Sequence, residues 1–167
     1  MKTTLRRLIL ICFALFASLS FAPATHAAPT TCTSTVRISG TDFGTVVVTG
    51  NEAHYHDFQV AGAYESGMLA RSTVSGAQEV RQNQVNGRAT VQGSYVVTSS
   101  EGTLTTRYNA TIDGSGQVKG SFTTHDGTGA LADMQWTGTI SGQLVGLDAQ
   151  GLPTYLVTLS GPCGNCV

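Results

Sequence analysis

The stretch 126–142 reads DGTGALADMQWTGTISG and holds four glycines and the single tryptophan of the chain. A phosphate-binding glycine loop would need a helix directly after the glycines, because the amides at a helix N-terminus hold the phosphate. No helical periodicity follows here. Apolar and small residues instead alternate with polar ones, which predicts a long strand. One face of this strand carries Met134, Trp136, Gly138, Ile140, Gly142, Leu144 and Gly146.

Glycines on the inward face of a strand allow sharp bending and close backbone approach, which closing a small barrel requires. The same alternation continues over most of the chain after its N-terminal segment, in eight to ten strands with short connections such as Asn86-Gly87. We therefore expect an all-β domain, an antiparallel closed β-barrel of about eight strands. The residues expected to be buried are Val91, Tyr95, Tyr108, Ile112, Phe122, Trp136, Ile140 and Val157.

The N-terminal segment has the pattern of a secretory signal peptide. A basic start precedes a largely apolar run over 8–21, and small residues follow at Ala27 and Ala28. The run is short for a lasting membrane anchor, which is the alternative. We expect residues 1–27 to be removed, leaving a single domain over 28–167 that is secreted or periplasmic and has no membrane association.

Charge argues against two classes of partner. Three of the nine Lys and Arg residues lie in the signal segment, so six remain against ten Asp and Glu, a net charge of −4. A mildly acidic, lightly charged domain is a poor partner for nucleic acid or for anionic membrane surfaces.

Three cysteines remain after the signal segment, and export favours a disulfide among them. Cys163 and Cys166 have the spacing of a redox motif, but they follow a strand at the chain end and do not begin a helix. In a closed barrel with an even number of antiparallel strands, the first strand starts beside the end of the last. This geometry favours a Cys32–Cys163 bridge, with Cys32–Cys166 and Cys163–Cys166 as alternatives.

The glycine-rich stretch resembles a recurring segment, G-T-G-x-L/F-A-G-x-x-G-x-G-T. That segment occurs in small bacterial barrel proteins related in fold to the allene oxide cyclase barrel. The similarity covers Gly127 to Gly142, with Asp133 and Trp136 standing where the segment has glycine. The resemblance implies an eight-stranded barrel of this calycin-like type with a central cavity. It implies no particular reaction, because no catalytic residue of the plant enzyme maps onto this sequence.

The cluster NEAHYHDF over 51–58 contains the best candidates for a metal site. His54 and His56 share their strand parity with Phe58 and Val60, which predicts an inward face. Two histidines spaced this way can both bind zinc, and His125 is the candidate third ligand. The alternatives are a solvated barrel rim and a polar contact to a ligand in the cavity.

Three aromatic residues are candidate ligand contacts, because their parity points them inward. Tyr95 and Tyr108 would make a cavity amphipathic, and Trp136 would either line it or act as a core plug. No sequence motif for a catalytic serine is present. The leading hypothesis is an exported barrel that binds a small apolar or amphipathic ligand. The alternatives are an isomerase or cyclase using the same cavity, and a structural or protein-interaction barrel with a filled core.

Overall fold

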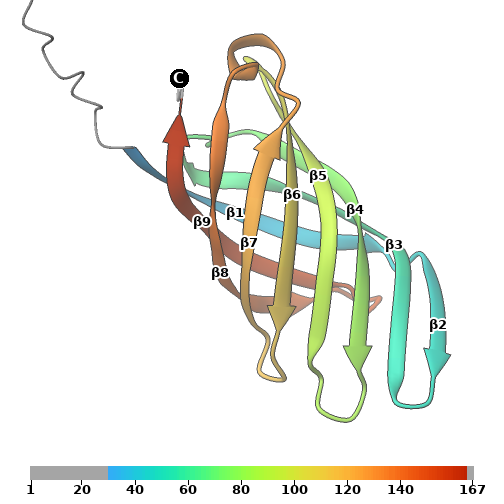
Figure 1. The fold of residues 1–167 in the computed structure, drawn as a ribbon. Coiled ribbons are helices and arrows are strands. Elements are labelled where there is room, and N and C mark those ends of the chain that lie inside the picture. The colour runs from blue at the N-terminus through green and yellow to red at the C-terminus, as the bar shows by residue number, and fades with distance from the viewer. Residues whose placement is uncertain (1–29, 165–167) are drawn as a thin grey trace, which may run out of the picture.

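The computed structural model describes residues 30–164. The predicted signal segment and Cys166 lie outside this range. The described chain is almost entirely β-structure (Figure 1). Its strands are β1 (Thr30–Asp42), β2 (Thr45–Thr49), β3 (Glu52–Gly67), β4 (Thr73–Asn83), β5 (Ala89–Ser99), β6 (Gly102–Ile112), β7 (Gln117–His125), β8 (Gln135–Leu147) and β9 (Pro153–Gly164).

Eight of these strands form a closed antiparallel barrel. The strand order is β1-β9-β8-β7-β6-β5-β4-β3, and β1 pairs with β3 to close the ring. The ninth strand, β2, pairs only with the first half of β3 and stands beside the barrel as a hairpin arm (Figure 1). The expected closed barrel of about eight strands is therefore confirmed.

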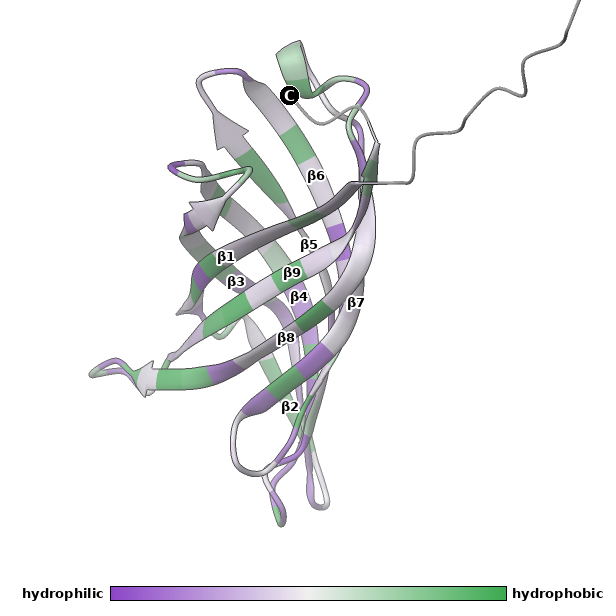
Figure 2. Cartoon of the chain, turned by 90° about the vertical axis from the view of Figure 1, so that its left-hand side faces the viewer, coloured by the Kyte–Doolittle hydropathy of each residue, from purple (hydrophilic) through white to green (hydrophobic). Residues whose placement is uncertain are grey.

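Glycines of β8 and β9 allow the close backbone approach expected for a small barrel. A Cβ atom at Gly138 would lie 2.1 Å from the carbonyl oxygen of Ser160, and one at Gly161 would lie 2.0 Å from that of Thr137. No other residue type fits so close to a neighbouring strand. The two glycines thus let β8 and β9 approach closely as they curve around the barrel wall (Figure 2).

The two ends of the barrel differ. The β7–β8 connection carries a single 3-10 turn, η1 (Gly129–Leu131), and closes one end by burying Leu131, Met134 and Trp136. Leu69, in the β3–β4 connection at the same end, is also buried. The hairpin loops β2–β3, β4–β5 and β6–β7 lie at the opposite end. Within residues 30–164, no helix is long and apolar enough to cross a membrane.

The predicted inward faces are confirmed in the core. Seven of the eight residues expected to be buried are buried, and Ile112 is partly buried because it lies near the open end. Apolar and polar residues alternate along most strands (Figure 2). The largest side chains with almost no exposed surface are those of Trp136, Leu104, Leu159, Val36, Val97, Thr106 and Ser34.

A disulfide joins Cys32 of β1 to Cys163 of β9, with the two Cα atoms 5.8 Å apart. The strands run antiparallel with Thr30 opposite Cys163, so the start of the first strand lies beside the end of the last. This is the arrangement that barrel closure predicts, and the expected Cys32–Cys163 pairing is confirmed.

Candidate functional site

An internal cavity of about 70 Å³ lies in the middle of the barrel. Its walls are aliphatic and aromatic, and Gln78 and three tyrosines supply its polar side-chain atoms. Among the described residues, no Asp, Glu, His, Lys or Arg lines it. The lining comprises Ile38, Gly40, Phe58, Val60, Gln78, Val91, Tyr95, Tyr108, Ala110, Ile112, Val118, Ile140, Pro153, Tyr155, Val157 and Leu159.

A larger recess of about 490 Å³ forms the mouth of the barrel at its open end. Phe43, Tyr55, Val80 and Leu144 contribute much of its apolar wall, and Asp113 lies on it as a charged group. The mouth and the cavity are contiguous, because both are lined by Phe58, Gln78, Val91, Ile112, Pro153 and Tyr155.

The polar groups inside the barrel are neutral hydrogen-bonding groups. The Tyr108 hydroxyl donates to Gln78 Oε1, and the Tyr64 and Tyr95 hydroxyl oxygens lie 3.1 Å apart. Burial raises the pKa of Tyr64 to about 12 and also raises the pKa values of Tyr95 and Tyr108 well above the ordinary value. These hydroxyls therefore stay protonated at physiological pH, where they can orient a polar atom but do not act as bases.

Two of the three predicted aromatic ligand contacts lie on the cavity, and one does not. Tyr95 and Tyr108 line it, with their rings 5.5 Å apart. Trp136 is 2 % exposed and packs edge-on against Phe122 at 4.7 Å, within the plug at the closed end. Trp136 therefore fills the core at the closed end, as the second alternative expected. It lies there because β8 begins at Gln135, at that end of the barrel.

The predicted inward face of His54 and His56 is wrong, because a β-bulge interrupts β3. Tyr55 pairs with Val80 and Phe58 pairs with Gln78, so two residues of β3 lie opposite one residue of β4. The bulged residue between them, Asp57, has a φ of 56°. An extra residue reverses the alternation of faces.

The consequences of this reversal are visible on both sides of the barrel wall. Ala53 before the bulge and Phe58 after it are both buried, although their positions differ by an odd number. His54 borders a recess of the outer surface together with Glu79 and Arg81. Neither His54 nor His56 lines the cavity, so the predicted ligand contact inside the barrel is not formed by these two residues.

His125 is not the third member of the histidine cluster. Its Nδ1 lies 2.6 Å from Asp126 Oδ2 at the closed end of the barrel. Across the paired strands, His54 stands in register with Lys119 of β7. His125 lies six residues further along β7, which adds roughly 20 Å along the strand direction. The third position beside the two histidines belongs to Glu79 of β4, the single residue opposite the bulge.

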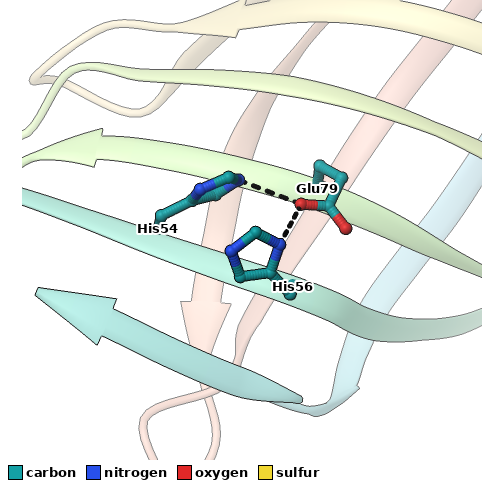
Figure 3. A group of neighbouring side chains, drawn as sticks. All are labelled: His54, His56 and Glu79. Atoms are coloured by element: carbon teal, nitrogen blue, oxygen red, sulfur yellow. Dashed lines mark ion pairs between the residues drawn. The ribbon is translucent and has the colours of Figure 1, made fainter.

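The His54 and His56 rings both contact one carboxylate oxygen of Glu79 (Figure 3). Glu79 Oε2 lies 2.9 Å from His54 Nε2 and 2.8 Å from His56 Nδ1, and the two rings lie 3.7 Å apart. The Asp57 backbone N–H donates to Glu79 Oε1 at 3.3 Å. Desolvation acts to raise the pKa of Glu79, but this N–H and the two imidazoles outweigh it and hold the pKa below its ordinary value.

Sequence reasoning missed Glu79 because nothing in its own strand marks it. Its place in the cluster depends on the register between β3 and β4, which the bulge sets. A His-x-His pair signals two ligands, whereas the third comes from whichever strand pairs beside it.

Comparison of the chain with protein-family models, with curated proteins and with solved structures finds no match.

Proposed function

We propose that this protein binds a small apolar or amphipathic molecule in the mouth and cavity of its barrel. The observation that carries the proposal is the continuous apolar space from the open end to the buried tyrosines. Ligand sites in proteins are concave and mostly apolar, with a few polar groups that fix orientation. Gln78, Tyr95 and Tyr108 supply such groups at the inner end.

The sizes of the two spaces indicate how a ligand would lie. Pockets for small molecules measure about 300–1,000 Å³. The mouth falls within this range, whereas the cavity of about 70 Å³ holds only a short apolar group. We therefore propose that the body of the ligand occupies the mouth and that a narrow apolar part enters the cavity.

Binding is favoured over the isomerase or cyclase alternative by the chemistry of the lining. Proton-transfer catalysis needs a group whose pKa lies near the working pH. The cavity tyrosines have pKa values raised by burial, and the carboxylate on the mouth, Asp113, has a lowered pKa because it accepts hydrogen bonds from Ser115 and the Gln117 N–H. Neither kind of group suits a general base or acid at neutral pH.

We propose that the protein is exported from the cytoplasm. The signal-like segment over 1–27 supports secretion or export to a periplasm, and the Cys32–Cys163 disulfide fits an oxidising compartment. The resemblance of the glycine-rich stretch to barrels related to allene oxide cyclase supports ligand binding rather than a compartment, since such barrels enclose a central cavity.

The test uses an uncharged fluorescent probe, N-phenyl-1-naphthylamine, whose emission rises in apolar surroundings. We expect saturable enhancement with the wild-type chain. Ile112→Trp fills the junction of mouth and cavity and should abolish the enhancement. Thr111→Trp is the matched control, because this exposed neighbour lies on the outer face of the same strand. Unchanged probe binding by a folded Ile112→Trp variant would refute the proposal.

A further inference from the structure

We propose that His54, His56 and Glu79 form a binding site for a divalent transition-metal ion, best suited to Zn²⁺, on the outer face of β3 and β4. The site lies on the opposite side of the barrel wall from the cavity, so it is independent of the proposed ligand binding. Its donor set is two imidazole nitrogens and one carboxylate oxygen, which is a set that zinc accepts in proteins.

The spacing of the donor atoms fits a metal ion after a small adjustment. One nitrogen or oxygen from each residue lies within 4.8 Å of the other two. Around a tetrahedral zinc with bonds of about 2.0–2.1 Å, neighbouring donors are about 3.4 Å apart. The present contacts of 2.8 and 2.9 Å to Glu79 Oε2 would therefore open by about half an ångström, which side-chain rotation supplies.

The backbone holds the donors in place. The bulge at Asp57 gives β3 its extra residue directly after His56, so that His56 lies opposite Glu79, while His54 pairs with Arg81 two positions away on the same face. The Asp57 N–H binds Glu79 Oε1, leaving Oε2 directed at the two rings. Such outer contacts orient ligands in known metal sites. In addition, the 2.9 Å contact with Glu79 Oε2 is not a well-directed hydrogen bond, and His54 Nε2 has no other hydrogen-bond partner among the described residues.

The surroundings leave room for further ligands of the metal. The side chains of His54, His56 and Glu79 are 27 %, 40 % and 45 % exposed, so water has access to the remaining coordination position. Arg81 borders the same surface recess as His54 and Glu79, and its positive charge opposes a cation. Imidazole and carboxylate donors also suit Cu²⁺ and Ni²⁺, so zinc is expected to compete with these ions.

The test measures binding of Zn²⁺ by calorimetry and of Co²⁺ by its visible absorption. The protein is prepared without a histidine tag. All samples carry Cys166→Ser, so that this cysteine, which lies outside the described residues, supplies no thiolate ligand to the metal. We expect one ion per chain. His54→Ala, His56→Ala and Glu79→Gln should each weaken binding by at least about tenfold, since even outer-contact changes cost 10–100-fold. Arg81→Gln should tighten it.

The matched control is His125→Ala, which removes a histidine that also has a carboxylate partner but lies at the closed end. It should leave the affinity unchanged. Thermal unfolding without metal shows that each variant is folded, and zinc should raise the melting temperature only where the site is intact. No saturable binding up to 100 μM zinc, or equal loss in the His125→Ala variant, would overturn the proposal.

Discussion

Removing the cross-link between the first and last strands should cost this domain a large part of its stability. Cys32 and Cys163 are separated by 131 positions, so their bridge encloses nearly the whole described chain in one loop. On the chain-entropy model, closing a loop of this size lowers the entropy of the unfolded chain by about 17 cal/mol/K. This corresponds to about 5 kcal/mol at 25 °C. Measured effects of disulfides commonly run from 2 to 4 kcal/mol.

The cleanest comparison is between the oxidised and fully reduced wild-type chain, because the side chains are identical and only the cross-link differs. Equilibrium unfolding in urea should show a loss of about 3–5 kcal/mol in the free energy of unfolding. With a slope of about 2 kcal/mol/M, the midpoint would fall by about 1.5–2.5 M. Cys163→Ser should reproduce the loss.

Cys166→Ser is the control, because it leaves the Cys32–Cys163 bridge intact and should unfold at the wild-type midpoint. Non-reducing peptide mapping establishes the pairing in each sample. A loss below about 1 kcal/mol on reduction would refute the argument that this bridge constrains the unfolded chain. An equal loss in Cys166→Ser would show that another pairing carries the stability.

Two further predictions concern alkaline pH and the bulge. Because burial raises the pKa of Tyr64 from 10 to about 12, its contribution to stability is complete below pH 10 and is lost between pH 10 and 12. The free energy of unfolding should fall in this range by up to about 1.4 kcal/mol per pH unit for this group. Tyr64→Phe should make this dependence of stability on pH less steep, and an unchanged dependence would contradict the prediction. At the bulge, Asp57→Gly should be neutral or slightly stabilising, whereas Asp57→Val should cost about 1–2 kcal/mol in urea unfolding, because its φ of 56° suits glycine. Equal effects of the two substitutions would contradict the assigned backbone strain.

The sequence was sufficient to predict the features that depend on alternation and closure. The inward positions of Trp136 and Ile140 follow from a period of two along one strand. The Cys32–Cys163 pairing follows from the even number of antiparallel strands in a closed ring. Both arguments use local patterns and one global constraint, and neither needs the register between particular strands.

The face of the histidines depends on register, and there the prediction was wrong. The prediction assumed unbroken alternation of faces from Phe58 back to His54. Asp57 lies between them, and there β3 has one residue more than β4. Neither Asp57 nor its neighbours are glycine, so nothing in the composition of 51–58 marks a bulge. Glu79 was missed for the same reason, because its position opposite the bulge exists only once the two strands are paired.

The bulge has a structural cause in the way β3 changes partners. Before it, residues 52–56 pair with β2, and after it, from Gln59 onward, β3 pairs with β1. The chain between β1 and β2 turns at Gly44, where a Cβ would lie only 2.0 Å from the carbonyl oxygen of His56. The corner therefore sits directly against the bulge. The bulge therefore lies where β2, which pairs only with β3, extends beyond the closed barrel. It also places Tyr55 on the mouth and His54 on the outer surface. One extra residue in β3 thus keeps the proposed apolar site and the proposed metal site on opposite faces of one strand.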